Sequence, residues 1–377
     1  MKVKFMQAQI LRPTLLIDKV KCINNINRMI DKASGNKLIF RPHFKTHQSI
    51  LIGEWYRAAG VNKITVSSVK MAEYFASNKW NDITIAFPVN VRETEQINSL
   101  SAKINLNLLV ADIQTIDLLR TKIITDTGIY VELDLGYHRS GIDISKLELL
   151  KEIVNKISGS SFLRFKGFLT HAGDTYNAEN PEMVSAVHLR NIKLLNSLRK
   201  IFIADWPELI ISIGDTPSCS VSDNFGGIDE IRPGNFVFYD LMQQKLGVCL
   251  FKDIGVIVLA PVVSLNNTRD EIVIYGGGIH LSKEYLVDNE GRKYFGKVVF
   301  PDNDLNWGDP EDGSYLAGLS QEHGIIKASK NMMRNINIGD LVGIMPVHSC
   351  LTANLIGKYT DKEGNGFDHM AQNKNTS

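Results

Sequence analysis

Short apolar runs alternate with helix-like segments along the first two thirds of the chain. Eight runs rich in β-branched residues predict buried strands at 37–40, 63–67, 82–87, 104–110, 129–135, 165–170, 209–213 and 231–239. Between most of them, apolar positions recur every three or four residues and predict helices at 50–59, 71–77, 113–122, 145–157 and 181–203. This alternation indicates a closed (β/α)8 TIM-type barrel, with an open doubly wound sheet as the alternative.

The pattern changes after about Cys249. Alternating strand-like runs at 255–263, 271–275, 297–300 and 340–345 are separated by Gly, Pro, Asn and Asp, which predicts a C-terminal β-rich domain. The run at 14–17 also resembles a strand and can return to that domain. The predicted domains are therefore a barrel over 20–250, and a β-rich domain made of 1–19 and 251–377. The polar tail at 361–377 is expected to be frayed.

Composition narrows the classes of partner. The 377 residues are 44% hydrophobic and 22% charged, as in soluble globular proteins. Lys plus Arg total 42 and Asp plus Glu total 41, so no net field attracts nucleic acid or a membrane, and a small-molecule partner is expected. The chain shows neither a signal peptide nor an apolar run of membrane-spanning length, and its four cysteines form no CxxC pair. We therefore expect a cytoplasmic protein with reduced thiols.

A lysine between two histidines follows the first predicted strand, in the segment Arg41-Pro42-His43-Phe44-Lys45-Thr46-His47. A lysine at the mouth of a buried strand can lose hydration, and a desolvated amine has the lowered pKa that a Schiff-base nucleophile needs. A solvated loop lysine is the alternative interpretation of this segment alone.

The residues after the predicted strands are unusually polar, and in a (β/α)8 barrel these positions build the active site. They are Lys45 and His47 after the first strand, Asp134, Tyr137, His138 and Arg139 after the fifth, His171, Asp174 and Tyr176 after the sixth, and the segments 214–217 and 232–235 at the last two. Their convergence on one end of the barrel favours a functional Lys45.

The segments 214–217 and 232–235 have the glycines and backbone amides that barrels use to hold a phosphate after strands seven and eight. A tight turn explains either segment alone, whereas the two together favour a phosphate site. A reactive lysine beside such a site indicates pyridoxal phosphate, whose aldehyde bonds a lysine.

Five motifs span most of the chain: Pro42-His43-Phe44-Lys45-Thr46-His47, Gly214-Asp215-Thr216-Pro217, Arg232-Pro233-Gly234-Asn235-Phe236 with Tyr239-Asp240, Gln321-Glu322-His323-Gly324, and His348-Ser349-Cys350. In this order they resemble the fold-type III pyridoxal-phosphate enzymes, the family of alanine racemase, and within it the D-serine dehydratase and D-threonine aldolase group. The cofactor-binding residues that this resemblance implies are Lys45 for the Schiff base, Gly214, Thr216, Gly234 and Asn235 for the phosphate, Arg139 and Tyr176 beside the ring, and Arg232, which matches the racemase arginine at the pyridine nitrogen.

His348 and Cys350 follow the predicted strand 340–345. In an extended chain, positions i and i+2 point the same way, so an imidazole and a thiolate can meet one ion, and this donor pair favours zinc over magnesium. From the spacing alone, a packed histidine beside an inert cysteine is the alternative. The resemblance implies a metal pair at this point, holding Zn2+ or another divalent ion. Glu322 and His323 are candidates to support these ligands.

The leading hypothesis is a pyridoxal-phosphate- and zinc-dependent D-amino-acid dehydratase of the D-serine or D-threonine ammonia-lyase type. In the group that the chain resembles, dehydratases carry cysteine where aldolases carry an aspartate, and here Cys350 stands at this position. The alternatives are a D-threonine or 3-hydroxy-D-aspartate aldolase, then an amino-acid racemase or a non-catalytic cofactor-binding protein. The resemblance also implies a homodimer.

Overall fold

The computed structural model describes residues 10–371, which fall into two compact units. The barrel unit comprises Asn27–Lys45 and Glu54–Gly234. The β unit comprises the described chain up to Ile26, the segment Thr46–Gly53, and the described chain from Asn235. These bounds differ from the sequence-based ones because hydrogen bonds draw flanking segments into the β unit: Asn25 Nδ2 donates to the carbonyl oxygens of Val237 at 3.2 Å and Asp253 at 2.9 Å.

The barrel unit contains eight parallel strands. They pair in the order β2-β10-β9-β8-β6-β5-β4-β3, with β7 (Ile142–Asp143) paired to β6 off this path. A parallel bridge between His43 and Thr65 joins the two ends, and the Phe44 N–H donates to the Thr65 carbonyl at 2.9 Å. The predicted closed barrel is thereby confirmed. The strands are β2 (Ile39–Phe40), β3 (Ile64–Val66), β4 (Asp82–Pro88), β5 (Asn105–Val110), β6 (Thr127–Asp134), β8 (Leu163–Thr170), β9 (Ile210–Ile213) and β10 (Glu230–Ile231).

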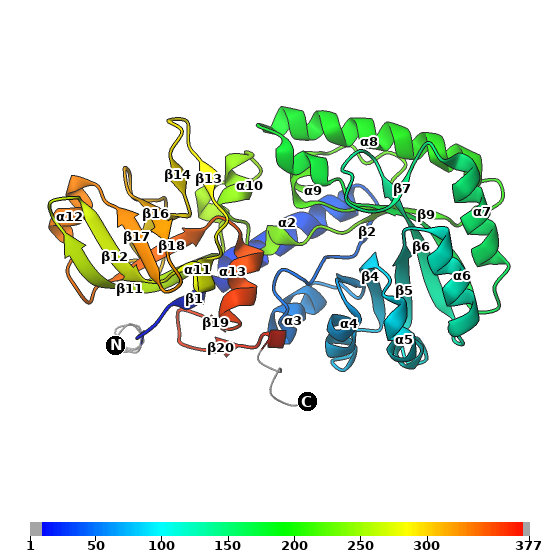
Figure 1. The fold of residues 1–377 in the computed structure, drawn as a ribbon, viewed down its shortest axis with the longest axis horizontal. Helices are drawn as coiled ribbons and strands as arrows, with labels where there is room; N and C mark the ends of the chain where they lie inside the picture. The colour runs from blue at the N-terminus through cyan, green and yellow to red at the C-terminus, as the bar shows by residue number, and fades with distance from the viewer. Residues whose placement is uncertain (1–9, 372–377) are drawn as a thin grey trace. The chain divides into compact units, whose positions relative to one another are not determined.

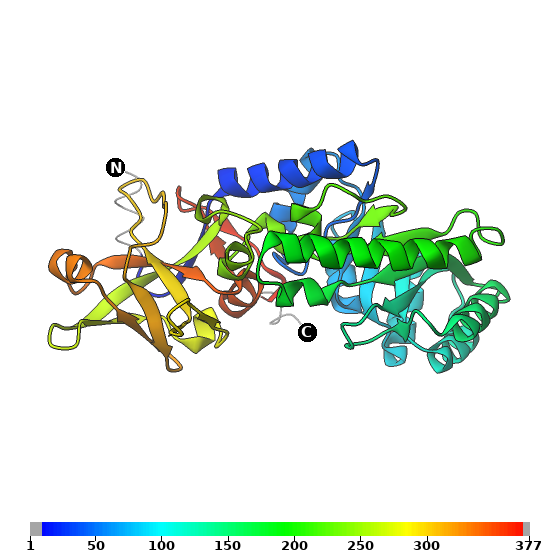
Figure 2. The same ribbon diagram turned by 90° about the horizontal axis from the view of Figure 1, so that it is seen from above.

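Helices cover the outside of the strands (Figure 1). On α7 the buried residues are spaced by three and four, so that one face packs inward. The longest helix, α8, is drawn in green in Figure 2. The helices are α2 (Lys19–Gly35), α3 (Ile50–Ala58), α4 (Val69–Ala76), α5 (Thr94–Ser101), α6 (Ile113–Lys122), α7 (Leu147–Ser158), α8 (Pro181–Phe202) and α9 (Thr216–Val221), with 3-10 turns η1 (Val91–Glu93) and η2 (Gly173–Asn177).

The eighth predicted strand, 231–239, is correct only at its start. β10 ends at Ile231, and the chain then forms the 3-10 turn η3 (Asn235–Val237) and the helix α10 (Leu241–Lys245). Pro233 has no N–H to donate to a ladder and its ring fixes φ, so the apolar residues beyond it cannot continue the strand.

The β unit is built on one nine-stranded sheet, in the order β12-β17-β16-β15-β18-β11-β1-β19-β20. β1 pairs antiparallel with β11, as expected for an opening strand that returns to this unit. β16 and β17 were not predicted. The strands are β1 (Thr14–Ile17), β11 (Val256–Asn266), β12 (Glu271–Tyr275), β15 (Gly296–Val299), β16 (Tyr315–Leu319), β17 (His323–Lys327), β18 (Leu341–Pro346), β19 (Tyr359–Thr360) and β20 (Gly366–Phe367), besides the hairpin β13 (Leu286–Val287) and β14 (Lys293–Tyr294).

Short helices connect the strands of the β unit. They are η4 (Phe251–Asp253), α11 (Gly278–Leu281), α12 (Lys330–Asn335) and α13 (Ser349–Ile356). The expected frayed tail is wrong for 361–371, which include β20 and a buried His369, while 372–377 lie outside the described residues. Among residues 10–371, no helix has the length and apolar character needed to cross a membrane.

Candidate functional site

The backbone around Lys45 is held firmly within the barrel unit. Phe44 is fully buried, and its ring packs edge-on against Phe75 and Trp80 with centroids 5.0 Å away. The Lys45 N–H donates to His43 Nδ1 at 3.3 Å. The Lys45 side chain itself is exposed, so the surrounding chain does not provide the desolvation expected at a strand mouth. The barrel unit therefore fixes the backbone of Lys45, while the lysine side chain extends from it.

Two histidines, the buried His43 and the partly buried His171, lie close to Lys45, Arg139 and Arg232. Burial lowers the pKa of His43 well below its ordinary value, and the charges of Lys45 and Arg232 lower it further. Burial likewise lowers the pKa of His171 to about 3, and Arg139 adds to this effect. Both imidazoles are therefore neutral at pH 7. We call these five residues the cationic cluster; three positive side chains acting on the same imidazoles suit an anionic ligand.

Arg232 is anchored inside the barrel. Its Nε donates to Ser212 Oγ and its Nη2 to the Thr170 carbonyl, both at 2.7 Å. Ser212 Oγ in turn donates to Glu230 Oε1 at 2.7 Å, and Arg41 Nε donates to Glu230 Oε2 at 2.6 Å. Glu230 is thus a buried carboxylate that is connected to Arg232 through Ser212 and counters its positive charge.

The loop after β9 is shaped as a close-packed cradle. A Cβ on Gly214 would lie 3.0 Å from Arg232 Cβ and 3.1 Å from the Arg232 carbonyl oxygen, so only glycine fits there without displacement. The Gly214 carbonyl accepts from His171 Nδ1 at 2.5 Å. Asp215 caps α9, accepting from the Ser218 N–H at 2.7 Å, and Thr216 is buried as the first residue of this helix.

Arg139 and Tyr176 approach His171 from two segments. The Tyr176 ring centroid lies 6.2 Å from that of His171. The Arg139 guanidinium lies 5.5 Å from the Tyr137 ring centroid, and the Tyr137 ring lies 5.9 Å from His171. His43 and His171 were not predicted as cofactor-binding residues; the available signal was the position of His171, directly after a buried strand.

Gly234 is the last residue of the barrel unit, and Asn235 is the first of the β unit. The Asn235 side chain is buried and donates to Asp240 Oδ2 at 2.7 Å and to Ser349 Oγ at 3.1 Å. Its Oδ1 has no hydrogen-bond partner in the described chain. Because the Nδ2 group is engaged with Asp240, the phosphate contact that the resemblance implies for Asn235 would have to come from its backbone N–H.

His348 and Cys350, the metal pair, lie at the start of α13 rather than in extended chain. His348 is the N-cap residue and Cys350 is in the first turn, so the expectation of an extended segment is wrong. The two side chains nevertheless interact. Burial disfavours the imidazolium, but hydrogen bonds to Cys350 and Glu284 raise the pKa of His348 above its ordinary value. Burial also disfavours the Cys350 thiolate, yet His348 lowers the thiol pKa overall.

A carboxylate orients the imidazole of the metal pair. Glu284 Oε2 lies 2.7 Å from His348 Nδ1, so Nε2 is the ring nitrogen that could reach a metal ion, as in carboxylate–histidine–zinc arrangements. Glu284, rather than the expected Glu322 or His323, is the residue that contacts His348. His323 is exposed on β17, and Glu322 instead acts electrostatically on His280. Within residues 10–371, no group of three or more His, Cys, Asp or Glu side chains is placed to hold a metal ion.

Two further contacts fix the segment that carries the metal pair. Asp240 Oδ2 accepts from the Ser349 N–H at 3.0 Å and from its hydroxyl at 3.2 Å, joining α10 to the start of α13. Cys350 Sγ lies 3.4 Å from Oγ1 of Thr46, the residue that follows Lys45 in the chain. The donor set of one nitrogen and one sulfur, with Glu284 behind the nitrogen, fits a zinc ion that completes its shell with water or substrate.

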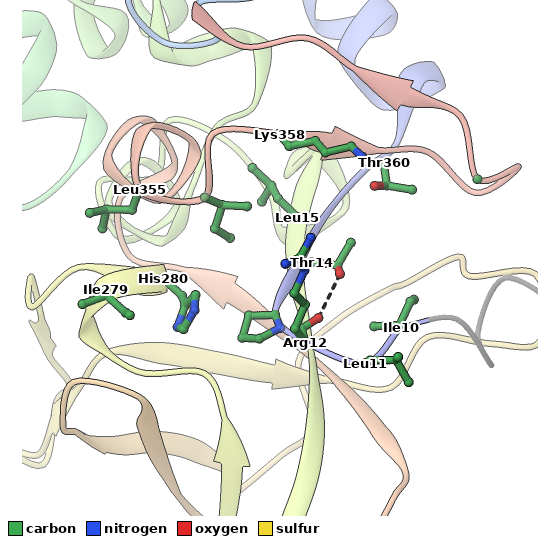
Figure 3. Close-up of a pocket in the computed structure, with 13 residues that line it drawn as sticks. Ile10, Leu11, Arg12, Thr14, Leu15, Ile279, His280, Leu355, Lys358 and Thr360 are labelled. Atoms are coloured by element: carbon green, nitrogen blue, oxygen red, sulfur yellow. Dashed lines mark hydrogen bonds between the residues drawn. The ribbon is translucent and has the colours of Figure 1, made fainter. Parts of the chain in front are cut away.

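The β unit also contains an open pocket of about 820 Å³, shown in Figure 3. It lies between the start of β1, α11, the end of α13 and β19, and its polar lining residues include Arg12, His280 and Lys358. None of the predicted site residues lines it. The residue chemistry therefore places the candidate site elsewhere.

Comparison with known proteins gives concordant matches to both parts of the chain. The family described as "Alanine racemase, N-terminal domain" matches residues 17–241, and the "Putative serine dehydratase domain" matches 255–360. The D-serine dehydratase of Dictyostelium discoideum is 30% identical over 373 residues, covering 92% of this chain and 91% of that protein. The D-threo-3-hydroxyaspartate dehydratase of a Delftia species is 29% identical, covering 90% and 91%.

A solved structure has the same fold over nearly the whole chain. A mutant D-threo-3-hydroxyaspartate dehydratase in its metal-free form superposes with a TM-score of 0.88 at 25% identity, covering 96% of this chain and 98% of that one. The (β/α)8 barrel followed by an antiparallel β domain is therefore an arrangement that this chain shares with a known enzyme.

Proposed function

The chain belongs to the fold-type III, alanine racemase-like pyridoxal-phosphate enzymes, in the D-serine dehydratase group, and we propose that it is a D-amino-acid dehydratase acting on a β-hydroxy substrate. D-Serine is the leading substrate, with D-threonine and D-threo-3-hydroxyaspartate next. The products would be a 2-oxo acid and ammonia. The observation that carries this proposal is the metal pair, a cysteine and a carboxylate-backed histidine held at the start of one helix.

The cationic cluster and the Gly214 cradle fit pyridoxal phosphate, because a phosphate dianion would compensate the positive side chains gathered there. The cofactor supplies an aldehyde that bonds amines and a ring that takes up the charge developing at the α-carbon. The proposed binding residues are Lys45 for the aldehyde, Gly214, Thr216, Gly234 and the Asn235 backbone for the phosphate, Arg139 and Tyr176 beside the ring, and Arg232 at the ring nitrogen. This assigns cofactor binding to the barrel unit together with Asn235, the first residue of the β unit, and metal binding to the β unit.

We assign to Lys45 Nζ the acceptance of the substrate α-proton. The fixed backbone at Phe44 and Lys45 restricts where this amine can reach, as a positioned base requires. His43 and His171 remain neutral and so do not compete as acids with the lysine at neutral pH. The Gly214 carbonyl fixes His171 in the tautomer with hydrogen on Nδ1, leaving Nε2 as an acceptor.

The residues of the metal pair would hold a divalent ion, and zinc fits their nitrogen and sulfur atoms best. Such an ion supplies Lewis acidity for the departure of a hydroxyl group. Glu284 keeps the His348 ring oriented, Asp240 fixes the backbone at Ser349, and Thr46 contacts the Cys350 sulfur. These residues preorganise two ligands and leave the remaining positions for water and substrate.

An aldolase that splits the Cα–Cβ bond of D-threonine or 3-hydroxy-D-aspartate is the second candidate. It is favoured by the two neutral imidazoles of the cationic cluster, because this reaction needs a base for the hydroxyl proton. The aspartate that aldolases of the group carry at the position of Cys350 is absent here, which supports dehydration.

We also propose a homodimer in the cytoplasm. The dimer is proposed from the family relationship. The location is supported by Cys22, Cys219 and Cys350, which are reduced thiols and so suit a reducing compartment.

Product analysis tests the proposed reaction. The purified protein, supplied with pyridoxal phosphate and zinc, is incubated with the D and L forms of serine, threonine and threo-3-hydroxyaspartate. We expect pyruvate and ammonia from D-serine, or the corresponding 2-oxo acid from another D substrate. Glycine with an aldehyde would establish the aldolase instead, and racemised amino acid alone would exclude both reactions.

A further inference from the structure

The chain near its C-terminus folds back onto the loop that follows Lys45. This loop, 46–49, belongs to the β unit together with the segment 359–370. Tyr359 Oη donates to the His47 carbonyl at 2.6 Å, and the Met370 N–H donates to the Gln48 carbonyl at 2.8 Å. Tyr359 and Met370, each more than 300 positions later in the sequence, thus bind the consecutive loop residues His47 and Gln48.

Asp368 supplies the N-terminal cap of α3, the helix that the loop leads into. Its Oδ1 accepts from the Ser49 hydroxyl at 2.7 Å and from the Leu51 N–H at 3.0 Å, while its Oδ2 accepts from the Ile50 N–H at 2.8 Å. A carboxylate at a helix N-terminus satisfies otherwise unpaired N–H groups and interacts favourably with the helix dipole. Ser49, at the usual neighbouring position, caps the Ile52 N–H at 3.1 Å, so the distant Asp368 satisfies the two preceding N–H groups, those of Ile50 and Leu51.

The loop needs such support because its conformation is costly. Gln48 has φ of +46°, a left-handed conformation that residues with a Cβ seldom adopt. Thr46, His47 and Ser49 are fully buried, and the Gln48 side chain donates to Asn354 Oδ1 at 3.3 Å, from the last turn of α13. External contacts therefore stabilise a geometry that the local sequence does not favour.

This loop is joined to both parts of the proposed chemistry. A peptide bond links Thr46 to Lys45, and Thr46 Oγ1 lies 3.4 Å from the sulfur of Cys350. We propose that Asp368 is a positioning residue for the reaction: by capping α3 it fixes the loop 46–49, and through that loop it sets the placement of Lys45 and the environment of Cys350. This inference rests on the proposed function, since it takes Lys45 as the residue that bonds the cofactor.

The test compares two helix-capping aspartates in the full-length protein. Asp368→Ala removes the distant cap of α3, whereas Asp112→Ala removes the local cap of α6, where Asp112 Oδ1 accepts from the Thr115 N–H at 2.7 Å. Cofactor Kd is measured by absorbance titration of the cofactor-free protein, and retained zinc is measured after dialysis. We expect Asp368→Ala to weaken cofactor binding about tenfold, equivalent to about 1.4 kcal/mol, and to lose zinc faster than wild type.

Asp112→Ala is expected to leave cofactor Kd and zinc retention within about twofold of wild type. It should lower the melting temperature by about as much as Asp368→Ala does, because each substitution removes one helix cap. Equal melting shifts with unequal cofactor binding separate positioning from general stability. A cofactor Kd for Asp368→Ala within twofold of wild type would overturn the proposal, as would equal weakening by both substitutions.

Two milder variants keep the proposal testable if Asp368→Ala does not fold. Asp368→Asn retains one acceptor oxygen and should weaken cofactor binding less than the alanine variant does. Tyr359→Phe removes one hydrogen bond to the loop and should weaken cofactor binding about threefold. If cofactor binding is unchanged in either variant, the proposal is contradicted. Failure of the proposed function is distinguishable, because then wild-type protein would form no borohydride-trapped cofactor adduct at Lys45, whatever Asp368 does.

Discussion

The cationic cluster of the barrel unit and the metal pair of the β unit have side chains that suit ligands of opposite charge. In the cluster, Lys45, Arg139 and Arg232 surround two imidazoles that burial keeps neutral. In the metal pair, an imidazole is held between a carboxylate and a thiol, and its pKa is raised. The surroundings thus lower the pKa of the histidines in the cationic cluster and raise the pKa of the histidine in the metal pair.

This difference indicates a division of labour. A region where three positive side chains gather favours an anion such as a phosphate, whereas a thiol and a carboxylate-backed imidazole favour a metal cation. Substitutions that act on one region and leave the other intact can test this division.

Replacing Lys45 by alanine should have the largest effect, since the lysine is proposed both to bond the cofactor and to accept the α-proton. A positioned general base alone contributes about 10²- to 10⁴-fold, so we expect 2-oxo acid formation to fall by about 10³-fold or more. Zinc content should not change. The exposed Lys103→Ala is the control, and a Lys45→Ala variant with more than a tenth of wild-type turnover would refute the assignment.

Glu230→Gln should destabilise the barrel unit by about 1.5–3 kcal/mol, because it removes the charge from one of the two carboxylates, Glu230 and Asp82, that pair with the buried Arg41. The measurement is chemical denaturation of the cofactor-free protein. Glu290→Gln is the matched control: Glu290 forms an exposed ion pair with Arg292, and its loss should cost below about 1 kcal/mol. Equal costs for both variants would show that Glu230 is not an essential counter-charge.

Glu284→Gln should lower zinc affinity about 10- to 100-fold, since the carboxylate orients His348 and increases its basicity. Competition with a chelator gives the affinity, and the absorbance of the bound cofactor should stay as in wild type. Glu322→Gln is the comparison variant, as sequence motifs alone placed Glu322 near the metal. A larger effect from Glu322 than from Glu284 would reverse the assignment made from the structure.

Acid should destabilise the cofactor-free protein in part through His171. Burial lowers the pKa of folded His171 to about 3, whereas an unfolded histidine titrates near its ordinary value of about 6.5. Between these values the unfolded state binds more protons, so stability falls as pH drops below about 6.5. From pH 6.5 to 5 we expect His171 to contribute about 2 kcal/mol of this loss. Denaturation at both pH values should show a smaller loss for His171→Asn, and an unchanged loss would disprove the lowered pKa.

Most of the fold was predictable because its apolar patterning is regular. The helix at 113–122 and the strands at 14–17 and 271–275 lie where the sequence places them. The eighth strand was overpredicted because Pro233 interrupts an otherwise apolar run. His348 and Cys350 do meet, but through a helix start rather than an extended chain, a distinction that spacing alone does not carry.

The supporting residues were less accessible to sequence reasoning. Glu284 lies 64 positions before His348, and Asp368 lies more than 300 positions after the start of α3, the helix that it caps. Neither sits in a recognisable motif, and both act through contacts that exist only once the β unit has folded. The tail at 361–371 lacks apolar periodicity, so its sequence predicts fraying; its order comes instead from hydrogen bonds to other segments.

The division between the two regions is tested most directly by removing the metal while keeping the cofactor. Protein loaded with both is treated with a chelator, dialysed, and given D-serine, with pyruvate production and cofactor absorbance recorded before and after zinc is returned. The account predicts that cofactor absorbance persists throughout, that pyruvate production stops without the metal, and that zinc restores it. Pyruvate production that continues undiminished in protein shown to be free of metal would contradict it.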